Sequence, residues 1–142
     1  MNEGLNAEGP GNDDYETPAW LAEALNTEFG FTLDAAASHT NAIAKMCFTK
    51  ETNGLEQPWG KHMVFVNPPY SEIEEWVDKA LFERGRGRII VLLLPSRTGT
   101  GWFQRLLNER AEFRFFRKRI KFCLNRVAEA SPRFDSILVI LR

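Results

Sequence analysis

The hexapeptide VNPPYS, residues 66–71, follows a short apolar run and combines residue types that could bind an amino group. A residue before proline is restricted to extended geometry and proline has no N–H, so Asn67 and Pro68 belong to a stiff, extended segment. This segment offers two hydrogen-bond acceptors, the Asn67 side-chain oxygen and the Pro68 main-chain carbonyl. The flat ring of Tyr70 follows closely. The pattern indicates a site for an amino group carried on a planar ring.

The same residues have a purely structural explanation. Two prolines before an aromatic residue also form rigid turns between a strand and a helix. On the hexapeptide alone both explanations stay open, so the surrounding sequence has to decide between them.

The composition suits one soluble domain. With 142 residues the chain can bury a single core, and its longest aliphatic run, at 89–94, is six residues and too short to cross a bilayer. We see no secretion signal, so we expect a cytoplasmic protein without a membrane partner. The only histidines and cysteines stand without metal-ligand spacing, so we expect no metal site and ordinary surface or cap roles for the histidines. These residues are His39, His62, Cys47 and Cys123.

Charge is divided unevenly along the chain. Residues 1–60 carry ten acidic and two basic side chains, whereas residues 61–142 carry nine acidic and sixteen basic ones. Residues 110–126 contain seven Lys or Arg, one Glu and four Phe. Basic residues interleaved with aromatic ones are typical of surfaces that bind a phosphate backbone and exposed bases. A solvated pair of strands with Phe facing the core is the alternative, and both readings stay open.

Helix signals follow a polar start. Residues 1–14 are rich in Gly, Asn, Asp and Glu and predict a flexible arm, with a single domain over 15–142. Thr17 is a suitable N-cap with Pro18 at the first helical position, and Gly30 ends the helix. The residues at helical spacing are Trp20, Leu21, Ala24 and Leu25.

Strands and helices alternate along the rest of the chain. Strands are expected over 31–36, 46–51, 63–67, 88–95, 112–116, 120–124 and 136–141. Helices are expected over 40–46, from a Ser71–Glu74 capping box to Gly85, and over 101–110, where Trp102, Phe103, Leu106 and Leu107 would be buried. Alternation followed by a strand-only end predicts an α/β three-layer sandwich whose mostly parallel sheet has an antiparallel C-terminal edge.

Polar residues stand where three predicted strands end. Asp34, Asn67 and Pro95–Ser96 each fall at a carboxyl end. Because ligands of such sheets bind beyond the carboxyl ends of the strands, we expect these residues to define one pocket.

From about Tyr15 to Leu141 the chain resembles the small phage-type Dam proteins, DNA adenine-N6 methyltransferases that use S-adenosyl-L-methionine (SAM). The resemblance rests on TPAWLAEALNTEFGFTLDAAAS, NGLEQPW, VNPPYS, LLLPSRTGTGWF and RIKF, in that order. It implies an abbreviated Rossmann-like methyltransferase fold, SAM as cofactor, double-stranded DNA as partner, no metal, and the cytoplasm of a bacterial host if the gene is phage-encoded. These linked motifs favour the functional explanation of VNPPYS.

The resemblance also assigns cofactor residues. It implies that Thr17 and Pro18 hold the methionine end of SAM, that Asp34 and Ala35 line the same pocket, and that Glu51 and Asn53 reach the ribose or adenine end. The chain departs from the broader methyltransferase pattern, because LDAAAS lacks a glycine-rich turn and thirty-two residues separate Asp34 from Asn67. Asn53 also stands where this family is expected to have Asp.

For the substrate, the resemblance implies a catalytic motif at Asn67, Pro68, Pro69 and Tyr70. An adenine in a duplex must be flipped out to reach it. Tyr70 and Phe122 would then stack on the base, and four basic residues would contact phosphates: Arg117, Lys118, Arg119 and Lys121. Arg97 would contact either DNA or cofactor.

Two alternatives remain. The same catalytic motif could present a glutamine amide of a protein, as in a protein glutamine-N5 methyltransferase. The basic and aromatic segment argues against this, since a protein substrate does not require a net charge of +6 over residues 110–126. A catalytically silent nucleic-acid-binding module on the same scaffold is the other alternative, which the intact Asn67 and Tyr70 disfavour.

Overall fold

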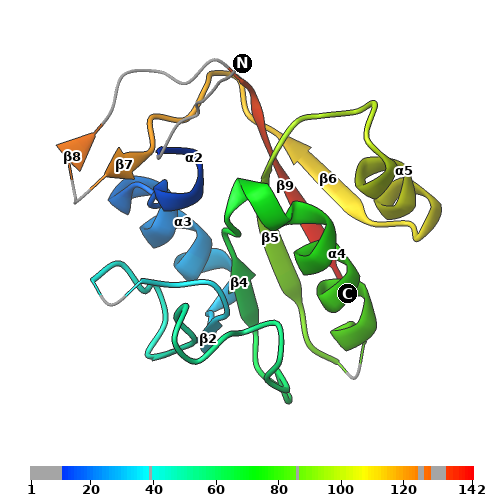
Figure 1. Cartoon of the computed structure of the whole chain (residues 1–142), viewed down its shortest axis with the longest axis horizontal. Coiled ribbons are helices and arrows are strands. Elements are labelled where there is room, and N and C mark those ends of the chain that lie inside the picture. Colours follow the sequence, from blue (N-terminus) through cyan, green and yellow to red (C-terminus); the bar gives the residue numbers. More distant parts are fainter. Residues whose placement is uncertain (1–10, 39, 86, 125–126, 129–133) are drawn as a thin grey trace.

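The computed structural model of the chain describes residues 11–38, 40–85, 87–124, 127–128 and 134–142, and its centre is a six-stranded mixed sheet (Figure 1). The strand order is β3-β2-β4-β5-β9-β6. The strands are β2 (Leu33–Asp34), β3 (Met46–Cys47), β4 (Val64–Val66), β5 (Ile90–Pro95), β6 (Glu112–Phe115) and β9 (Ser136–Leu141).

Parallel pairing dominates one side of the sheet. β2 pairs in parallel with both β3 and β4, and β4 pairs in parallel with β5. β9 is antiparallel to β5 and to β6, and it lies between them. The predicted α/β class, with a mostly parallel sheet and antiparallel pairing towards one edge, is therefore confirmed, and it is compatible with a Rossmann-like methyltransferase fold.

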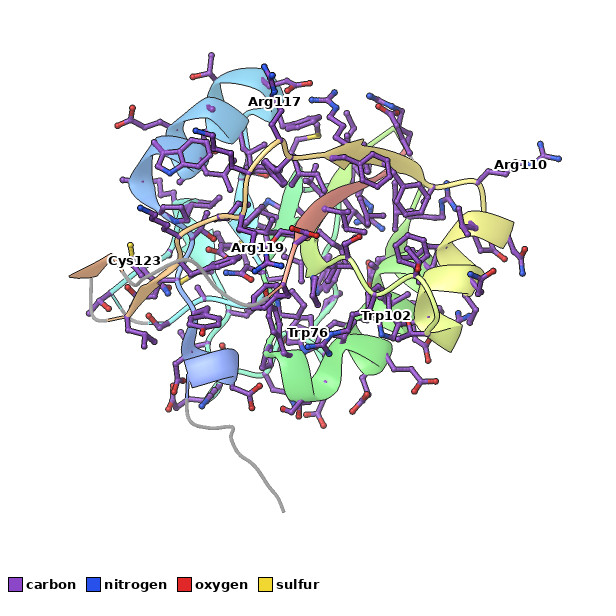
Figure 2. All side chains as sticks on the ribbon, turned by 90° about the horizontal axis from the view of Figure 1, so that it is seen from above. Trp76, Trp102, Arg110, Arg117, Arg119 and Cys123 are labelled. Atoms are coloured by element: carbon purple, nitrogen blue, oxygen red, sulfur yellow. The ribbon has the colours of Figure 1, made fainter. Side chains whose placement is uncertain are left out.

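Helices cover both faces of the sheet, which gives the predicted three layers. α3 (Ala19–Phe29) packs on one face, against side chains such as Val91 and Leu93 of β5. α4 (Ile73–Glu83) and α5 (Gly101–Asn108) pack on the other, against alternate residues such as Leu92. Seen from above, α3 and α4 lie on opposite sides of the strands (Figure 2). β5 is buried along its whole length because both of its faces are covered.

The helix predicted over residues 40–46 is wrong, since residues 40–45 form turns and bends. Side chains satisfy the backbone of Ile43 there: its N–H donates to the Asp34 carboxylate at 3.0 Å, and its carbonyl accepts from Asn26 at 2.7 Å. Such side-chain bonds compete with helical ones. The following strand is correspondingly short and consists of β3 alone.

The strand predicted over 120–124 does not join the main sheet. Cys123–Leu124 forms β7, which pairs with β8 (Val127–Ala128) in a separate two-stranded sheet. Just before it, Ile120 and Phe122 are buried in the core on the α3 side. The segment therefore crosses over that core and does not extend the sheet.

Neither of the two predicted N-cap residues, Thr17 and Ser71, caps its helix. Pro18, not Thr17, is the N-cap of α3, and the Thr17 hydroxyl accepts a hydrogen bond from Asn67. The Ser71–Glu74 capping box does not form, because Ser71 donates from its N–H and hydroxyl to Asp13 at 2.9 and 2.7 Å. Gly30, with a φ of 64°, ends α3 as predicted.

Asp13 lies within the stretch predicted to be a flexible arm. Residues 1–10 lie outside the described part of the chain, whereas Gly11–Asp14 forms the one-turn helix α2. α2 contacts η1 (Tyr70–Glu72), a short 3₁₀ helix that leads into α4.

Leu107 of α5, predicted to be buried, is 46% exposed. Trp20, one of the residues at helical spacing in α3, is 59% exposed. Both share a helix with well-buried neighbours, so the periodicity is correct but the apolar stripe is narrower than predicted.

The burial of Asp34 should make the free energy of unfolding depend on pH. Desolvation raises the pKa of its carboxyl from 3.8 to about 6, and the N–H groups of Ile43 and Ala36 offset this only in part. The folded state therefore holds the carboxyl proton of Asp34 more tightly than the unfolded chain does. As pH rises from 3.8 to about 6, loss of this proton lowers the free energy of unfolding.

Asp34→Asn removes the titration and keeps one acceptor oxygen. We expect the free energy of unfolding of wild type to fall relative to that of D34N by up to about 3 kcal/mol between pH 3.8 and about 6, and the difference to be constant above. Urea unfolding followed by tryptophan fluorescence at several pH values measures it. A pH-independent difference would contradict the prediction.

Candidate active site

A cavity of about 920 Å³ lies beyond the carboxyl ends of β2, β3 and β4. Its wall is formed by the loops that follow these strands, by the chain around Tyr15 and by Trp76 of α4. Strand ends next to a change in strand order are the usual ligand site of open α/β sheets. Of the three polar strand ends predicted to meet, Asn67 lines the cavity, Asp34 lies beneath it, and Pro95–Ser96 is not part of its wall.

Asn67 is held by the N-terminal segment. Its Nδ2 donates to the carbonyl of Tyr15 at 3.0 Å and to the hydroxyl of Thr17 at 3.2 Å. A carbonyl oxygen can only accept, so the NH₂ group must face Tyr15, which fixes the orientation of the amide. No described residue donates a hydrogen bond to Oδ1 of Asn67, so this oxygen is the acceptor that the residue can offer to a bound group.

The rest of the motif stands partly behind the cavity wall. Pro69 lines the cavity and its carbonyl accepts from Glu72 at 3.0 Å. Pro68 is buried, and its carbonyl accepts no hydrogen bond from a described residue. Tyr70 is only 7% exposed, and the guanidinium of Arg97 lies 5.9 Å from its ring centre.

The Tyr70 hydroxyl is buried without a hydrogen-bond partner among the described residues. Burial raises its pKa far above the usual value, so the group stays neutral. A buried polar group without a partner costs about 1–3 kcal/mol. The ring is therefore held by its neighbours and not by its hydroxyl.

Those neighbours form an aromatic cluster, which we define as Tyr15, Tyr70, Phe122 and Phe134. The ring of Tyr15 stacks on that of Phe122, with 5.3 Å between the ring centres. Tyr15 and Tyr70 are in edge contact, with ring centres 6.2 Å apart. The ring centres of Phe134 and Tyr70 are 5.3 Å apart. Phe122 is 1% exposed and does not line the cavity. In this structure it supports Tyr15 from behind, so the direct base contact that we expected of Phe122 is not open to it.

Sequence reasoning missed Tyr15. Its carbonyl orients Asn67, and the residue itself lines the cavity. The available signal was an isolated aromatic residue at the end of a polar segment, directly before the predicted cap at Thr17.

The six residues predicted to hold a cofactor divide into two groups. Those that line the cavity are Ala35, Glu51 and Asn53. The others support its wall: Thr17 binds Asn67, Pro18 begins α3, and Asp34 holds the backbone of the loop after β2. Asn53 has a φ of 54° and its Oδ1 accepts from Leu55 at 3.2 Å, a turn for which Asn is well suited.

Two cavity loops touch through their backbones at Gly54. A Cβ added at Gly54 would lie 2.1 Å from the carbonyl oxygen of Ala35, so only glycine fits. The Gly54 carbonyl accepts from the indole of Trp59 at 2.9 Å. The loop after β3 is therefore fixed on both sides.

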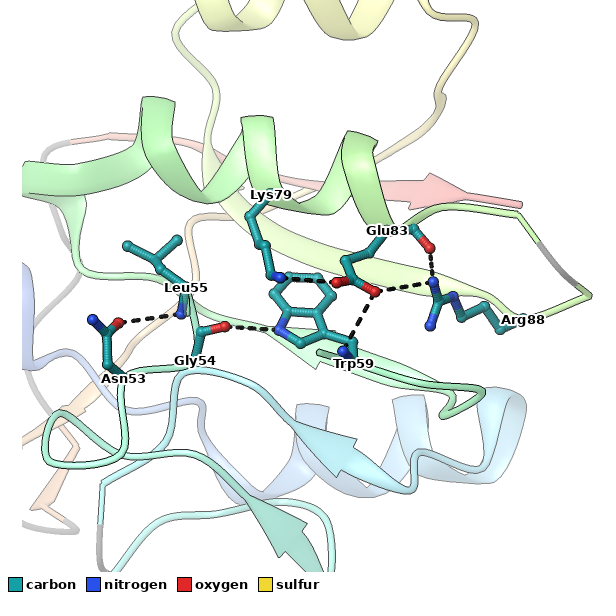
Figure 3. A network of polar contacts seen from close by, with 7 residues as sticks. All are labelled: Asn53, Gly54, Leu55, Trp59, Lys79, Glu83 and Arg88. Carbon is teal, nitrogen blue, oxygen red and sulfur yellow. Dashed lines mark hydrogen bonds and ion pairs between the residues drawn. The ribbon is translucent and has the colours of Figure 1, made fainter. Parts of the chain in front are cut away.

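A buried charged network holds Trp59 in turn (Figure 3). Its main-chain N–H donates to Glu83 at 3.3 Å, and Glu83 also binds Lys79 at 2.8 Å and Arg88 at 3.1 Å. Because Lys79 and Glu83 belong to α4, the network ties the cavity loop to that helix. A buried carboxylate with several donors is satisfied only while all of them stay in place.

The cavity and the basic segment have opposite charge. The charged residues of the cavity wall are Asp13, Asp14, Glu16, Glu51, Glu72 and a single cation, Lys50. Such a wall attracts cations and repels phosphates. The predicted phosphate-binding residues Arg117, Lys118, Arg119 and Lys121 come together elsewhere, around a second hollow of about 750 Å³.

No group of three or more His, Cys, Asp or Glu side chains within the described ranges could hold a metal ion. None of the described helices is both long and apolar enough to span a membrane. His62 lies 2.9 Å from the Thr32 hydroxyl near the surface, and His39 falls outside the described residues.

Comparison with known proteins agrees with these features. The family model for DNA N-6-adenine-methyltransferase (Dam) matches residues 5–142. The chain is 35% identical over 111 residues to the DNA N-6-adenine-methyltransferase of Escherichia phage T1, which covers 77% of this chain and 47% of that protein. It is 28% identical over 125 residues to the protein of the same name from Haemophilus phage HP1 (strain HP1c1), covering 85% and 72%.

The chain thus spans about half the length of its phage T1 relative. The family match, in contrast, extends over nearly all of the chain and includes every loop that forms the cavity wall. The chain therefore belongs to the Dam family of DNA N-6-adenine-methyltransferases.

Proposed function

We propose that this protein transfers a methyl group from SAM to the N6 amino group of an adenine in DNA. The observation that carries the proposal is the amide of Asn67, which is oriented by Tyr15 and Thr17 and keeps its oxygen available at a cavity wall. Family membership supports both the reaction and the substrate.

The cavity fits SAM in size and in chemistry. A volume of about 920 Å³ is within the usual range for a cofactor site, and the acidic wall suits a positively charged ligand. Trp76 lines the cavity and offers the face or edge of its ring, while its indole N–H is buried without a partner among the described residues. Ala35, Glu51 and Asn53 would hold the cofactor, which when bound supplies a methyl group on a positively charged sulfur.

Asn67 would act on the nucleophile. The lone pair of an adenine amino group is delocalised into the ring, which makes the nitrogen a weak nucleophile. Oδ1 of Asn67 can accept one of its N–H groups, and the carbonyl of the buried Pro68 would accept the other after rearrangement of the motif. Both would stabilise the positive charge that develops on the nitrogen. Fixed dipoles of this kind contribute roughly 3–4 kcal/mol per contact.

The opposite charges of the cavity and of the second hollow would decide which part of the DNA enters the cavity. A neutral base can approach the acidic cavity, whereas phosphates are repelled from it and attracted to the basic hollow. Flipping the base costs a few kcal/mol, and stacking on an aromatic ring returns about 1–3 kcal/mol. Tyr15, which lines the cavity, and Tyr70, after rearrangement of the aromatic cluster, are the rings that could supply it.

Asn67→Ala should lower kcat/KM for adenine methylation by at least about 100-fold, because it removes the oriented acceptor. Incubation with radiolabelled SAM and unmethylated DNA, followed by base analysis, measures transfer and identifies the product. Asn108→Ala, an exposed position at the end of α5, is the matched control and should retain activity. Near-normal transfer by a folded N67A protein would refute the acceptor role.

Thr17→Val tests the positioning of the amide. It removes one of the two acceptors for Nδ2 and should lower kcat about fivefold, the usual effect of one hydrogen bond, with the KM for DNA unchanged. Thr17→Ser keeps the hydroxyl and should restore the rate. Equal rates for the Val and Ser variants would show that the Thr17 contact does not position Asn67.

Gly54→Ala should separate the two cavity loops, because the new methyl group would meet the carbonyl oxygen of Ala35. We expect a loss of about 1–3 kcal/mol in the free energy of unfolding and weaker SAM binding, measured by urea unfolding and calorimetry. Gly99→Ala is the matched control, since nothing lies within 4 Å of its Cβ position. If G54A and G99A bind SAM equally well, the cavity is not the cofactor site.

A further inference from the structure

Trp20 occupies an unusual place for a tryptophan. It is 59% exposed, while Trp59, Trp76 and Trp102 are all buried. Together with Phe116, Arg117, Lys118, Arg119, Ile120 and Lys121 it lines the second hollow, of about 750 Å³, which we call the basic groove. The groove contains four cations and no acidic residue in its wall.

Both segments that form the groove continue directly into residues that support Asn67 or Tyr15. On the helix side, Trp20 is three residues from Thr17, whose hydroxyl binds Asn67. On the other side, Ile120 is two residues from Phe122, which stacks on Tyr15. Ile120 and Phe122 are buried in the α3-side core, so the groove has a fixed position relative to the catalytic amide. Figure 2 shows Arg117 beside α3, on the side of the sheet opposite Trp76.

The cations of the groove are available to an anion. Arg117, Lys118 and Lys121 are exposed and form no ion pair with a described residue. Arg119 differs, since it pairs with Asp135 at 3.3 Å. An exposed indole among such cations matches a polymer that alternates phosphates with flat rings, which is the composition of a nucleic acid.

We propose that Trp20 is a DNA-contacting residue whose indole stacks on a base close to the target adenine, while the cations of the basic groove bind the adjoining phosphates. This inference rests on the proposed function, because it takes DNA as the substrate. It adds a base contact outside the catalytic motif and outside the cavity, on the first turn of α3.

The protein carries its own reporter for this contact. Trp59 and Trp102 are buried away from the cavity, whereas Trp76 lines it, so the part of the quenching that Trp20→Phe removes is the part that reports on Trp20. Unmethylated DNA fragments should quench the fluorescence of wild type, and Trp20→Phe should remove the effect. Inorganic polyphosphate, which has charge but no bases, should compete for the groove without the same quenching. Equal quenching by polyphosphate, or none by DNA at saturation, would overturn the stacking contact.

Affinity measurements separate the ring from the charges. Trp20→Ala should weaken DNA binding about tenfold and leave the dependence of affinity on salt unchanged, since no charge is lost. Lys121→Ala should reduce the slope of log affinity against log salt by about one. Phe82→Ala, at an 82% exposed aromatic on α4, is the matched control and should bind like wild type. Thermal unfolding checks that each variant is folded.

The outcomes distinguish this inference from the proposed function. If wild type methylates adenine and W20A binds DNA as tightly as wild type, the inference is refuted and the function stands. If wild type transfers no methyl group to DNA, yet DNA quenches Trp20 and W20A binds more weakly, the function is refuted and the contact stands.

Discussion

The whole site depends on which atom of one side-chain amide is turned towards the cavity. An asparagine can present either a donor or an acceptor, and only the acceptor suits an incoming amino group. The carbonyl of Tyr15 decides this for Asn67, from a position 52 residues away in the sequence. In the proposed reaction the hexapeptide around Asn67 would supply the acceptor, and the N-terminal segment orients its amide. Without that segment the amide would be free to rotate.

The N-terminal segment is itself held at three successive points. Asp13 binds Ser71, Tyr15 binds Asn67, and Glu16 exchanges two backbone hydrogen bonds of 2.7 and 2.9 Å with Cys123. These contacts explain why both predicted helix caps are used differently. Thr17 and Ser71 have side chains that could cap a helix, and both are bound to another part of the site instead. At these positions a contact with a residue distant in sequence replaces the helix cap that the local sequence predicts.

Features set by local periodicity are predicted well from the sequence, and features set by distant partners are predicted less well. The end of β2 at Asp34, the end of β4 directly before Asn67, and the three-layer arrangement can be read from apolar runs and helical spacing. The path of residues 120–124, the support of Tyr15 by Phe122 and the exposure of Trp20 cannot, because each depends on the groups that lie opposite in space. The charge division along the chain, in contrast, has a spatial counterpart in an acidic cavity and a basic groove.

The short distance between Asp34 and Asn67 has a structural consequence. β2 and β3 have only two residues each, and no helix lies between β2 and β4 within the described residues. Backbone groups of the intervening loops are satisfied by side chains instead: Asp34 and Asn26 at Ile43, Asn53 at Leu55, and Trp59 at Gly54. These side chains make hydrogen bonds that a helix or strand would otherwise provide. Part of the polar character of this half of the chain is thus structural, and the loops it holds form the wall on which the proposed cofactor would bind.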